Sequence, residues 1–430
     1  METDLTVGLL AMLVAIYSMF ATRLMRWWIS APFAFLVIGV AVGLAEIDLL
    51  DQATDTSALL GGLAELTLAL VLFGAASTIR VRRLEHDTAI VGRLLVLGLP
   101  LTIALGAALA LGLFPGISFG LALLIGATLA PTDADLGHPV IADGSVPARV
   151  RRVLNAESGL NDGIVAPVIT IAIALAIGET SGLSPLSEAT VDLVVAAVVG
   201  LTVGGGGRWL LRRAIVRESA TPVSRQVATL AIALAAYFLA DGLDSSGFIA
   251  AFAAGITFGL GDKERVESEV RFTEDLSTLL TIAVWLVFGL LVVGDQGLGV
   301  DDPMVIVYAL LSLTLVRMLP VALALVGSGF DRGTVAFIGW FGPRGLASVV
   351  FVLLALDMLD ANGVAPGPLG PVVAWTVVLS VILHGFSATP LAAKLGARAK
   401  RLPADAPEFV GDQEPRRSGW HFHDRGRSRM

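Results

Sequence analysis

The polar residues that could do chemistry are concentrated between residues 126 and 168, inside two segments that are otherwise strongly apolar. They are Thr132, Asp133, Asp135, Glu157, Asn161 and Asp162. In a lipid bilayer each charged group costs about 2.5 to 3.5 kcal/mol on insertion scales, so ionisable residues there usually serve a function. Pro131 interrupts the first segment and frees backbone carbonyls beside the carboxylates. We therefore expect a site for a cation and a proton.

The spacing of the polar residues in the second segment places them on two faces of one helix. Ser158 and Asp162 are four residues apart and share a face. Glu157 and Asn161, also four apart, share the adjacent face. Arg344 lies in another apolar segment, stays protonated, and needs a carboxylate partner when it is buried. We expect Glu157 to be that partner, which leaves Asp162 as the unpaired acid.

An unpaired buried carboxylate can hold either a proton or a cation. Burial disfavours its ionised form and an arriving cation favours it, so the two compete for Asp162. The hydroxyls of Thr132 and Ser158, the Asp133 carboxylate and carbonyls freed at the helix break can complete an oxygen shell for a metal ion such as Na⁺. Asn161 cannot titrate. One acid that takes one proton or one monovalent cation predicts one-for-one, electroneutral exchange.

The composition indicates that membrane helices position these residues. Of the 430 residues, 55% are hydrophobic and 15% are charged, with a mean hydropathy of +0.82, whereas soluble domains contain about a quarter charged residues. The chain has no cysteine, which excludes disulfides and thiolate metal sites. The formal net charge is -8, no basic surface is gathered in one place, and nothing indicates a nucleic-acid partner.

Apolar runs of about 20 residues, the length that spans a bilayer, recur along the chain. We expect an all-α polytopic membrane protein with about thirteen transmembrane helices. Their approximate spans are 5–22, 31–50, 58–79, 94–113, 117–141, 153–177, 188–211, 224–241, 244–260, 274–294, 303–327, 333–357 and 370–393. Loops after odd-numbered spans are basic and those after even-numbered spans are acidic or neutral. The positive-inside rule then places the N-terminus outside and the C-terminus in the cytoplasm.

The predicted spans form two six-helix halves when the seventh span is treated as a linker. An odd spacing between equivalent helices inverts one half relative to the other, as in many secondary transporters. The fifth span of each half is interrupted beside a charge, at APTDAD around Pro131 and at FGPRGLAS around Pro343. We expect residues 1–393 to form the transmembrane domain. Residues 394–430, rich in proline, charge and small residues, would be a disordered cytoplasmic tail.

Three ordered motifs, APTDAD, NAESGLNDG and FGPRGLAS, resemble the signature helices of NhaP-like and NHE-like sodium/proton antiporters, the Asn-Asp branch of the cation/proton antiporter superfamily. The resemblance implies an NhaA/NhaP-like fold with crossing broken helices. It also implies a homodimer in which a core domain of spans 4–6 and 11–13 moves against an interface domain. Na⁺, or alternatively Li⁺ or K⁺, would exchange for H⁺ across the cell membrane in pH homeostasis or sodium tolerance. No cofactor and no enzymatic activity are implied.

The motifs also transfer roles to residues of this chain. The cation and proton ligands are implied to be Asp162, Asn161, Ser158, Thr132 and Asp133. Asp162 is the shared ligand of the cation and the proton in this comparison, and Asn161 orients Asp133 across the helix crossing. Glu157 and Arg344 match the family's buried ion pair.

Several other ionisable residues lie in the predicted spans without an assigned partner. Asp135 and His138 add titratable groups near the cytoplasmic mouth, where they could tune the response to pH. The alternative is that both are solvated at a helix end. Glu65 and Arg317 are charges for which the sequence identifies no partner. His384 is expected to be a hydrogen-bonded packing residue.

Three other functions compete with antiport. A channel would need a selectivity ring, and one asymmetric constellation without repeated filter loops argues against it. A sodium-coupled symporter of an organic anion with a similar inverted-repeat fold is the closest alternative, although two buried carboxylates favour a cation. An intramembrane hydrolase is disfavoured because no Ser-His, HExxH or paired-aspartate motif stands out. The choice among Na⁺, Li⁺ and K⁺ depends on site geometry and stays open.

Overall fold

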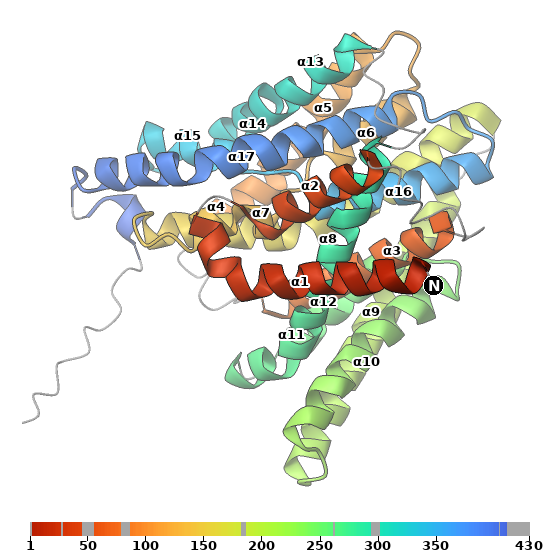
Figure 1. Cartoon of the computed structure of the whole chain (residues 1–430). Coiled ribbons are helices and arrows are strands. Elements are labelled where there is room, and N and C mark those ends of the chain that lie inside the picture. The colour runs from red at the N-terminus through yellow and green to blue at the C-terminus, as the bar shows by residue number, and fades with distance from the viewer. Residues whose placement is uncertain are drawn as a thin grey trace, which may run out of the picture.

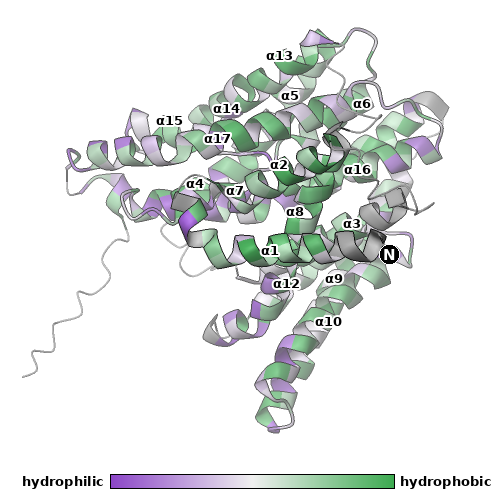
Figure 2. Ribbon diagram, in the orientation of Figure 1, coloured by the Kyte–Doolittle hydropathy of each residue, from purple (hydrophilic) through white to green (hydrophobic). Residues whose placement is uncertain are grey.

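The computed structural model describes residues 2–26, 29–44, 56–78, 87–181, 186–260, 263–293, 302–403 and 405–410. In this part of the chain each expected span coincides with one helix or one pair of helices (Figure 1). Eight helical stretches among the described residues are long and apolar enough to cross a membrane. Figure 2 shows hydrophobic residues along most of the helix lengths and hydrophilic residues mainly towards the ends. The predicted all-α, multi-span fold class is confirmed.

The helices follow the order of the predicted spans. Those that correspond to one span each are α1 (Glu2–Arg26), α2 (Ala31–Leu44), α3 (Thr56–Thr78), α8 (Ala148–Ser181), α9 (Leu186–Val216), α10 (Pro222–Asp241), α11 (Gly247–Gly259), α12 (Lys263–Val293) and α17 (Leu369–Ala399). The fifth span of each half is a broken pair, α6 (Phe119–Thr128) with α7 (Ala134–Ile141) and α15 (Arg332–Trp340) with α16 (Leu346–Ala361).

Two further spans each contain a π-helical turn. Leu94–Gly98 joins α4 (Thr88–Arg93) to α5 (Leu99–Leu113), and Ser312–Val316 joins α13 (Pro303–Leu311) to α14 (Arg317–Ala324). Such turns are rare and frequently lie at functional sites. They fall in the fourth span of each half, so this irregularity, like the helix break, repeats in the two halves.

Helices α2, α3, α9, α11 and α12 interlock through glycines. Gly39 of α2 and Gly289 of α12 face each other, because a Cβ added to either would lie 2.9 Å from the other's Cα. A Cβ on Gly200 of α9 would overlap the Ala250 carbonyl of α11, and one on Gly255 of α11 would lie 2.5 Å from a carbonyl of α3. Small residues that let backbones approach are typical of membrane bundles. These five helices therefore form one closely packed unit, which contacts α8 through α3, α9 and α11.

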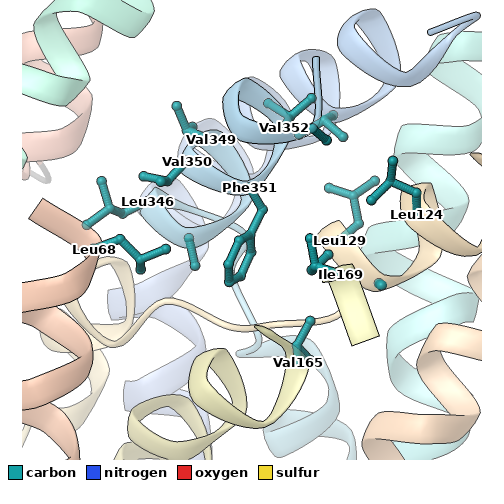
Figure 3. Close-up of a cluster of buried hydrophobic side chains, with 14 of the residues drawn as sticks. Leu68, Leu124, Leu129, Val165, Ile169, Leu346, Val349, Val350, Phe351 and Val352 are labelled. Atoms are coloured by element: carbon teal, nitrogen blue, oxygen red, sulfur yellow. The ribbon is translucent and has the colours of Figure 1, made fainter. Parts of the chain in front are cut away.

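An apolar cluster fills the space where the broken helices meet α8 and α3. Figure 3 shows the Phe351 ring of α16 pointing in among aliphatic side chains that include Leu129, Val165 and Ile169. All four residues are at most 2% exposed. Leu68 of α3 belongs to the same cluster, so it seals the contact between the broken helices and the glycine-packed unit.

The chain beyond residue 393 differs from the disordered tail that its composition predicts. α17 continues as a helix to Ala399, and residues 405–410, here called the C-terminal strap, pack against α8. The Glu408 carboxylate is 1% exposed and accepts hydrogen bonds from the Asp331 N–H (2.8 Å) and the Thr334 hydroxyl (2.9 Å) at the start of α15. Arg398 of α17 also pairs with Asp331 and, by donating to it, holds the pKa of the Asp331 carboxyl below its usual range.

A charged cluster at the start of α4 holds the other side of the strap. The buried Asp87 carboxylate accepts hydrogen bonds from the Nε atoms of Arg149 (2.7 Å) and Arg152 (2.8 Å) on α8. The same arginines donate to the carbonyls of Pro407 (2.7 Å) and Val410 (2.9 Å). The expectation of disorder is therefore wrong for the described part of residues 394–410, because core helices satisfy the strap's polar groups. Residues 411–430 lie outside the described residues.

Candidate cation and proton site

The two broken helix pairs cross at their breaks, and Asp133 lies at the crossing. Its N–H donates to the Pro343 carbonyl (2.8 Å). Its Oδ1 accepts the N–H groups of Asp135 (2.8 Å) and Leu136 (3.0 Å) at the start of α7. Its Oδ2 accepts the N–H of Leu346 at the start of α16 (2.8 Å). One carboxylate thus caps two half-helices, where the positive ends of both helix dipoles converge.

Gly345 is required by this arrangement. A Cβ at this position would overlap the Oδ2 atom of Asp133. Glycine in the FGPRGLAS motif therefore lets α16 begin directly against the carboxylate that caps it. Because both oxygens of Asp133 accept backbone hydrogen bonds, its main structural role is to hold the crossing together.

Arg344 stabilises the opposite helix end, and its predicted pairing with Glu157 is wrong. The fully buried Arg344 side chain donates from Nη1 to the carbonyls of Ala130 (2.9 Å) and Pro131 (3.1 Å), just beyond α6. A cation there stabilises the negative end of the helix dipole and satisfies carbonyls that the helix break leaves free. Backbone carbonyls at the break, and not a carboxylate, thus accept hydrogen bonds from Arg344.

Glu157 pairs with Arg317 instead. Nη1 and Nη2 of Arg317 donate to Oε1 (2.6 Å) and Oε2 (2.9 Å) of Glu157, and the two side chains are only 3% and 4% exposed. Arg317 directly follows the π-helical turn of its span. A Cβ on Gly342 would overlap its guanidinium, so the second glycine-containing break makes room for it. The sequence already showed that Arg317 is a charged residue inside the eleventh predicted span, 303–327, but it did not identify Glu157 as the partner.

Three polar side chains form a buried chain between the first break and α8. The Asn161 amide donates from Nδ2 to the Thr132 hydroxyl (2.7 Å), which is 2.9 Å from the Ser158 hydroxyl. All three residues are buried. The predicted contact of Asn161 with Asp133 is not formed. The Asn161 amide donates its hydrogen bond to Thr132, the residue that precedes Asp133. Asn161 therefore positions a hydroxyl of the site rather than the capping carboxylate.

Asp162 directly follows Asn161, and one of its carboxylate oxygens has no hydrogen-bond donor among the described residues. Within the described residues, the Oδ1 atoms of Asp162 and Asn161 are buried and accept no hydrogen bond. Buried acceptors without a donor are uncommon in proteins and call for an explanation such as an ion or a proton. The available ligands are a carboxylate, an amide oxygen and hydroxyls, a set that suits a hard cation. No three His, Cys, Asp or Glu side chains converge as metal ligands in the described part of the chain.

Asp135 and His138 of α7 are exposed, although α7 begins at the buried crossing. The backbone N–H of Asp135 donates to Asp133, but its carboxylate is left accessible. Their exposure agrees with the alternative that both side chains are solvated at a helix end. A role of these two residues in pH response stays a prediction.

An aromatic side chain of α11 packs against α8 directly after Asp162. A Cβ on Gly163 would overlap the ring of Phe252, a residue of α11. The aromatic ring therefore lies against the backbone of α8 one residue after the acid. Phe252 also packs against the cluster that contains Phe351.

The structure also supplies partners for two residues outside the site. The Tyr237 hydroxyl donates to the Glu65 carboxylate (2.8 Å). His384 is 2.8 Å from the Trp340 carbonyl at the end of α15 through Nε2 and 2.9 Å from the Ser380 carbonyl through Nδ1. It is buried, so its expected role as a hydrogen-bonded packing residue is confirmed.

Comparisons with known proteins agree with this geometry. The chain is 24% identical to the Na⁺/H⁺ antiporter ApNhaP of Aphanothece halophytica, over 90% of this chain and 72% of that protein. It is 27% identical to the K⁺/H⁺ antiporter NhaP of Alkalimonas amylolytica, over 91% of this chain and 66% of that protein.

A solved structure shows the same fold. The sodium proton antiporter MjNhaP1 from Methanocaldococcus jannaschii superposes with a TM-score of 0.73 at 23% sequence identity, covering 92% of this chain and all of that one. The family model described as the sodium/hydrogen exchanger, transmembrane, matches residues 8–394. The broken crossing helices, the partly buried acid and these similarities together establish that this chain belongs to the sodium/hydrogen exchanger family.

Proposed function

We propose that this protein exchanges one monovalent cation for one proton, with Asp162 as the shared ligand. Cation/proton antiport is the activity that the family and its named relatives support. The observation that carries the residue-level proposal is the pair of buried acceptors on Asp162 and Asn161, which lack donors within the described residues. A cation or a proton would satisfy the acid in turn.

The other charged side chains at the site have hydrogen-bond or ion-pair partners, although Nε and Nη2 of Arg344 have none among the described residues. Glu157 is neutralised by Arg317, Asp133 accepts three backbone N–H groups, and Arg344 donates to two carbonyls. Asp162 is therefore the group whose charge state can change at low cost during transport. Thr132 and Ser158 would complete the cation shell with hydroxyl lone pairs, and Asn161 would fix the orientation of Thr132.

One titrating acid supports electroneutral exchange. A bound Na⁺ and a bound H⁺ bring the same charge, so the membrane potential would do no work on the cycle. The named relatives include both sodium and potassium exchangers, and sodium is our first choice. The organic-anion symporter is not favoured, because the half-helix N-termini that would bind an anion are already capped by Asp133.

We further propose the setting of this activity from the loop charges and the family resemblance. The protein would lie in the cell membrane as a homodimer, with the N-terminus outside and the C-terminus in the cytoplasm. Spans 4–6 and 11–13 would move as the core domain.

Reconstitution tests the exchange and its stoichiometry together. Proteoliposomes loaded with a pH-sensitive dye and carrying an imposed proton gradient would receive NaCl, LiCl, KCl or choline chloride. We expect dye recovery with at least one alkali cation and none with choline, at a rate that does not change when the membrane potential is clamped at different values. A transport current under opposed gradients would refute electroneutral exchange, and no response to any alkali cation would refute antiport.

A further inference from the structure

The end of α9 that leads into α10 carries a cavity that the transport site does not use. Its volume is about 410 Å³, and it lies between α9 and the end of α11. The residues that decide its chemistry are Arg208, Trp209, Arg212, Arg213, Val216 and Leu260. α9 and α10 run side by side away from the broken helices (Figure 1), so this end of α9 lies away from the helix crossing.

The described residues that line the cavity carry an excess of positive charge. Arg208 is neutralised by a buried ion pair with Glu269 of α12. The Arg213 guanidinium lies 5.2 Å from the centre of the Trp209 ring, which is a cation–π contact rather than an ion pair. Arg212 has no hydrogen bond or ion pair with any described residue and is exposed. Among the described residues that line the cavity, none supplies a carboxylate to Arg212 or Arg213.

The depth of these groups places them at the membrane surface. From Leu186 to Arg208 the helix rises about 33 Å at 1.5 Å per residue, slightly more than the hydrocarbon thickness of about 30 Å. Arginine and tryptophan at this level can contact lipid headgroups while their apolar parts stay in the membrane. A phosphate group of the adjoining leaflet lies at the same depth.

An apolar stripe leads from the cavity along the same face of α9. Val191, Val194, Val198 and Leu201 are 48% to 60% exposed and recur at helical spacing towards the cavity. Trp209, Val216 and Leu260 at the cavity rim are exposed as well. A small anion would bind the arginines but would not cover the apolar side chains of this stripe. An amphiphile with an anionic head and an acyl chain would cover both.

We propose that this cavity binds the phosphate headgroup of an anionic membrane lipid, with an acyl chain along the stripe on α9. Arg212 and Arg213 contact the phosphate, and Trp209 packs beside the glycerol region. Basic pockets between transmembrane helices on the cytoplasmic side commonly bind such headgroups. The site does not depend on the proposed antiport, since it shares no residue with the crossing of the broken helices.

The test uses the full chain, purified in detergent and delipidated, with phosphatidylglycerol, phosphatidylcholine or inorganic phosphate as the probe. Bound lipid is counted by native mass spectrometry, and the unfolding temperature is measured with each probe. We expect phosphatidylglycerol to bind more tightly than phosphatidylcholine and to raise the unfolding temperature. Because each arginine near an anionic surface strengthens binding about fivefold, the double variant R212A/R213A should bind phosphatidylglycerol about 25-fold more weakly.

Arg332→Ala is the matched control, because it removes an exposed arginine at the start of α15, away from the cavity. It should leave lipid binding unchanged. Equal binding of the two lipids by the wild-type protein, or an unchanged preference in R212A/R213A, would overturn the proposal. Equal stabilisation by inorganic phosphate would assign the site to a free anion. Loss of a dimer in lipid-free R212A/R213A would assign the face to a second copy of the chain.

Discussion

The ion pair between Glu157 and Arg317 gives the most stringent test of the site's electrostatics. Both side chains are almost fully buried and make two parallel hydrogen bonds. Removing one partner of a buried pair leaves an uncompensated charge, which typically costs about 3 to 5 kcal/mol. Glu157→Gln keeps the shape and removes the charge, so it should destabilise the protein by an amount in that range. Arg317→Met should do the same from the other side.

A double-mutant cycle isolates the contact. In Glu157→Gln/Arg317→Met neither charge remains, so the loss should be smaller than the sum of the single losses by about 1 to 3 kcal/mol. The assay is chemical denaturation in detergent micelles, followed by tryptophan fluorescence. The matched cycle replaces Arg317→Met with Arg344→Met, whose guanidinium donates to helix-end carbonyls instead. If the cycle with Arg344 gives an equal or larger coupling energy, the assignment of Arg317 as the partner is wrong.

Three other substitutions test separate parts of the structure. Asp133→Ala removes the cap of two half-helices and should cost about 2 to 4 kcal/mol, at about 1 to 2 kcal/mol per cap, as measured by denaturation. Gly163→Ala should slow exchange in proteoliposomes because its methyl group meets the Phe252 ring, and Phe252→Leu in the same chain should restore the rate; a normal rate in the single variant would contradict this contact. Glu408→Ala should lower stability by about 1 to 3 kcal/mol, because it leaves buried donors unsatisfied, whereas a strap that contributes nothing would leave the denaturation midpoint unchanged.

The spans and the breaks could be predicted from the sequence because both follow from local rules. Hydrophobic length and the alternation of loop charge define the spans, and Pro131 and Pro343 cannot continue a helix hydrogen-bond ladder. The same rules place Asp162 in a membrane helix. These features depend on neighbours in the chain, so spacing alone suffices.

The partners of the buried charges could not be predicted in the same way. Arg317 and Arg344 are both arginines inside spans of the second half, and choosing between them for Glu157 requires the packing of separate helices. Arg344 meets carbonyls that only the crossing brings within reach. Asn161 likewise reaches Thr132 because of the orientation of α8 against the break.

The order of the C-terminal strap also could not be predicted from the sequence. Its composition is polar and proline-rich, which correctly indicates that it forms no core of its own. The order of residues 405–410 comes instead from donors on distant helices, such as Arg149 and Thr334, that satisfy Pro407 and Glu408. The composition of a segment indicates whether it can form a hydrophobic core of its own. It does not indicate which hydrogen-bond donors on other helices will bind the segment.

Competition between a cation and a proton for Asp162 can be measured as proton release from the purified protein. The protein in weakly buffered detergent solution receives NaCl, LiCl or KCl, with choline chloride at equal ionic strength as the blank, and a pH indicator records released protons. We expect about one proton per bound alkali cation for the wild type and for the control Asp135→Asn, and none for Asp162→Asn. Proton release that persists in Asp162→Asn, or that disappears in Asp135→Asn, would contradict it.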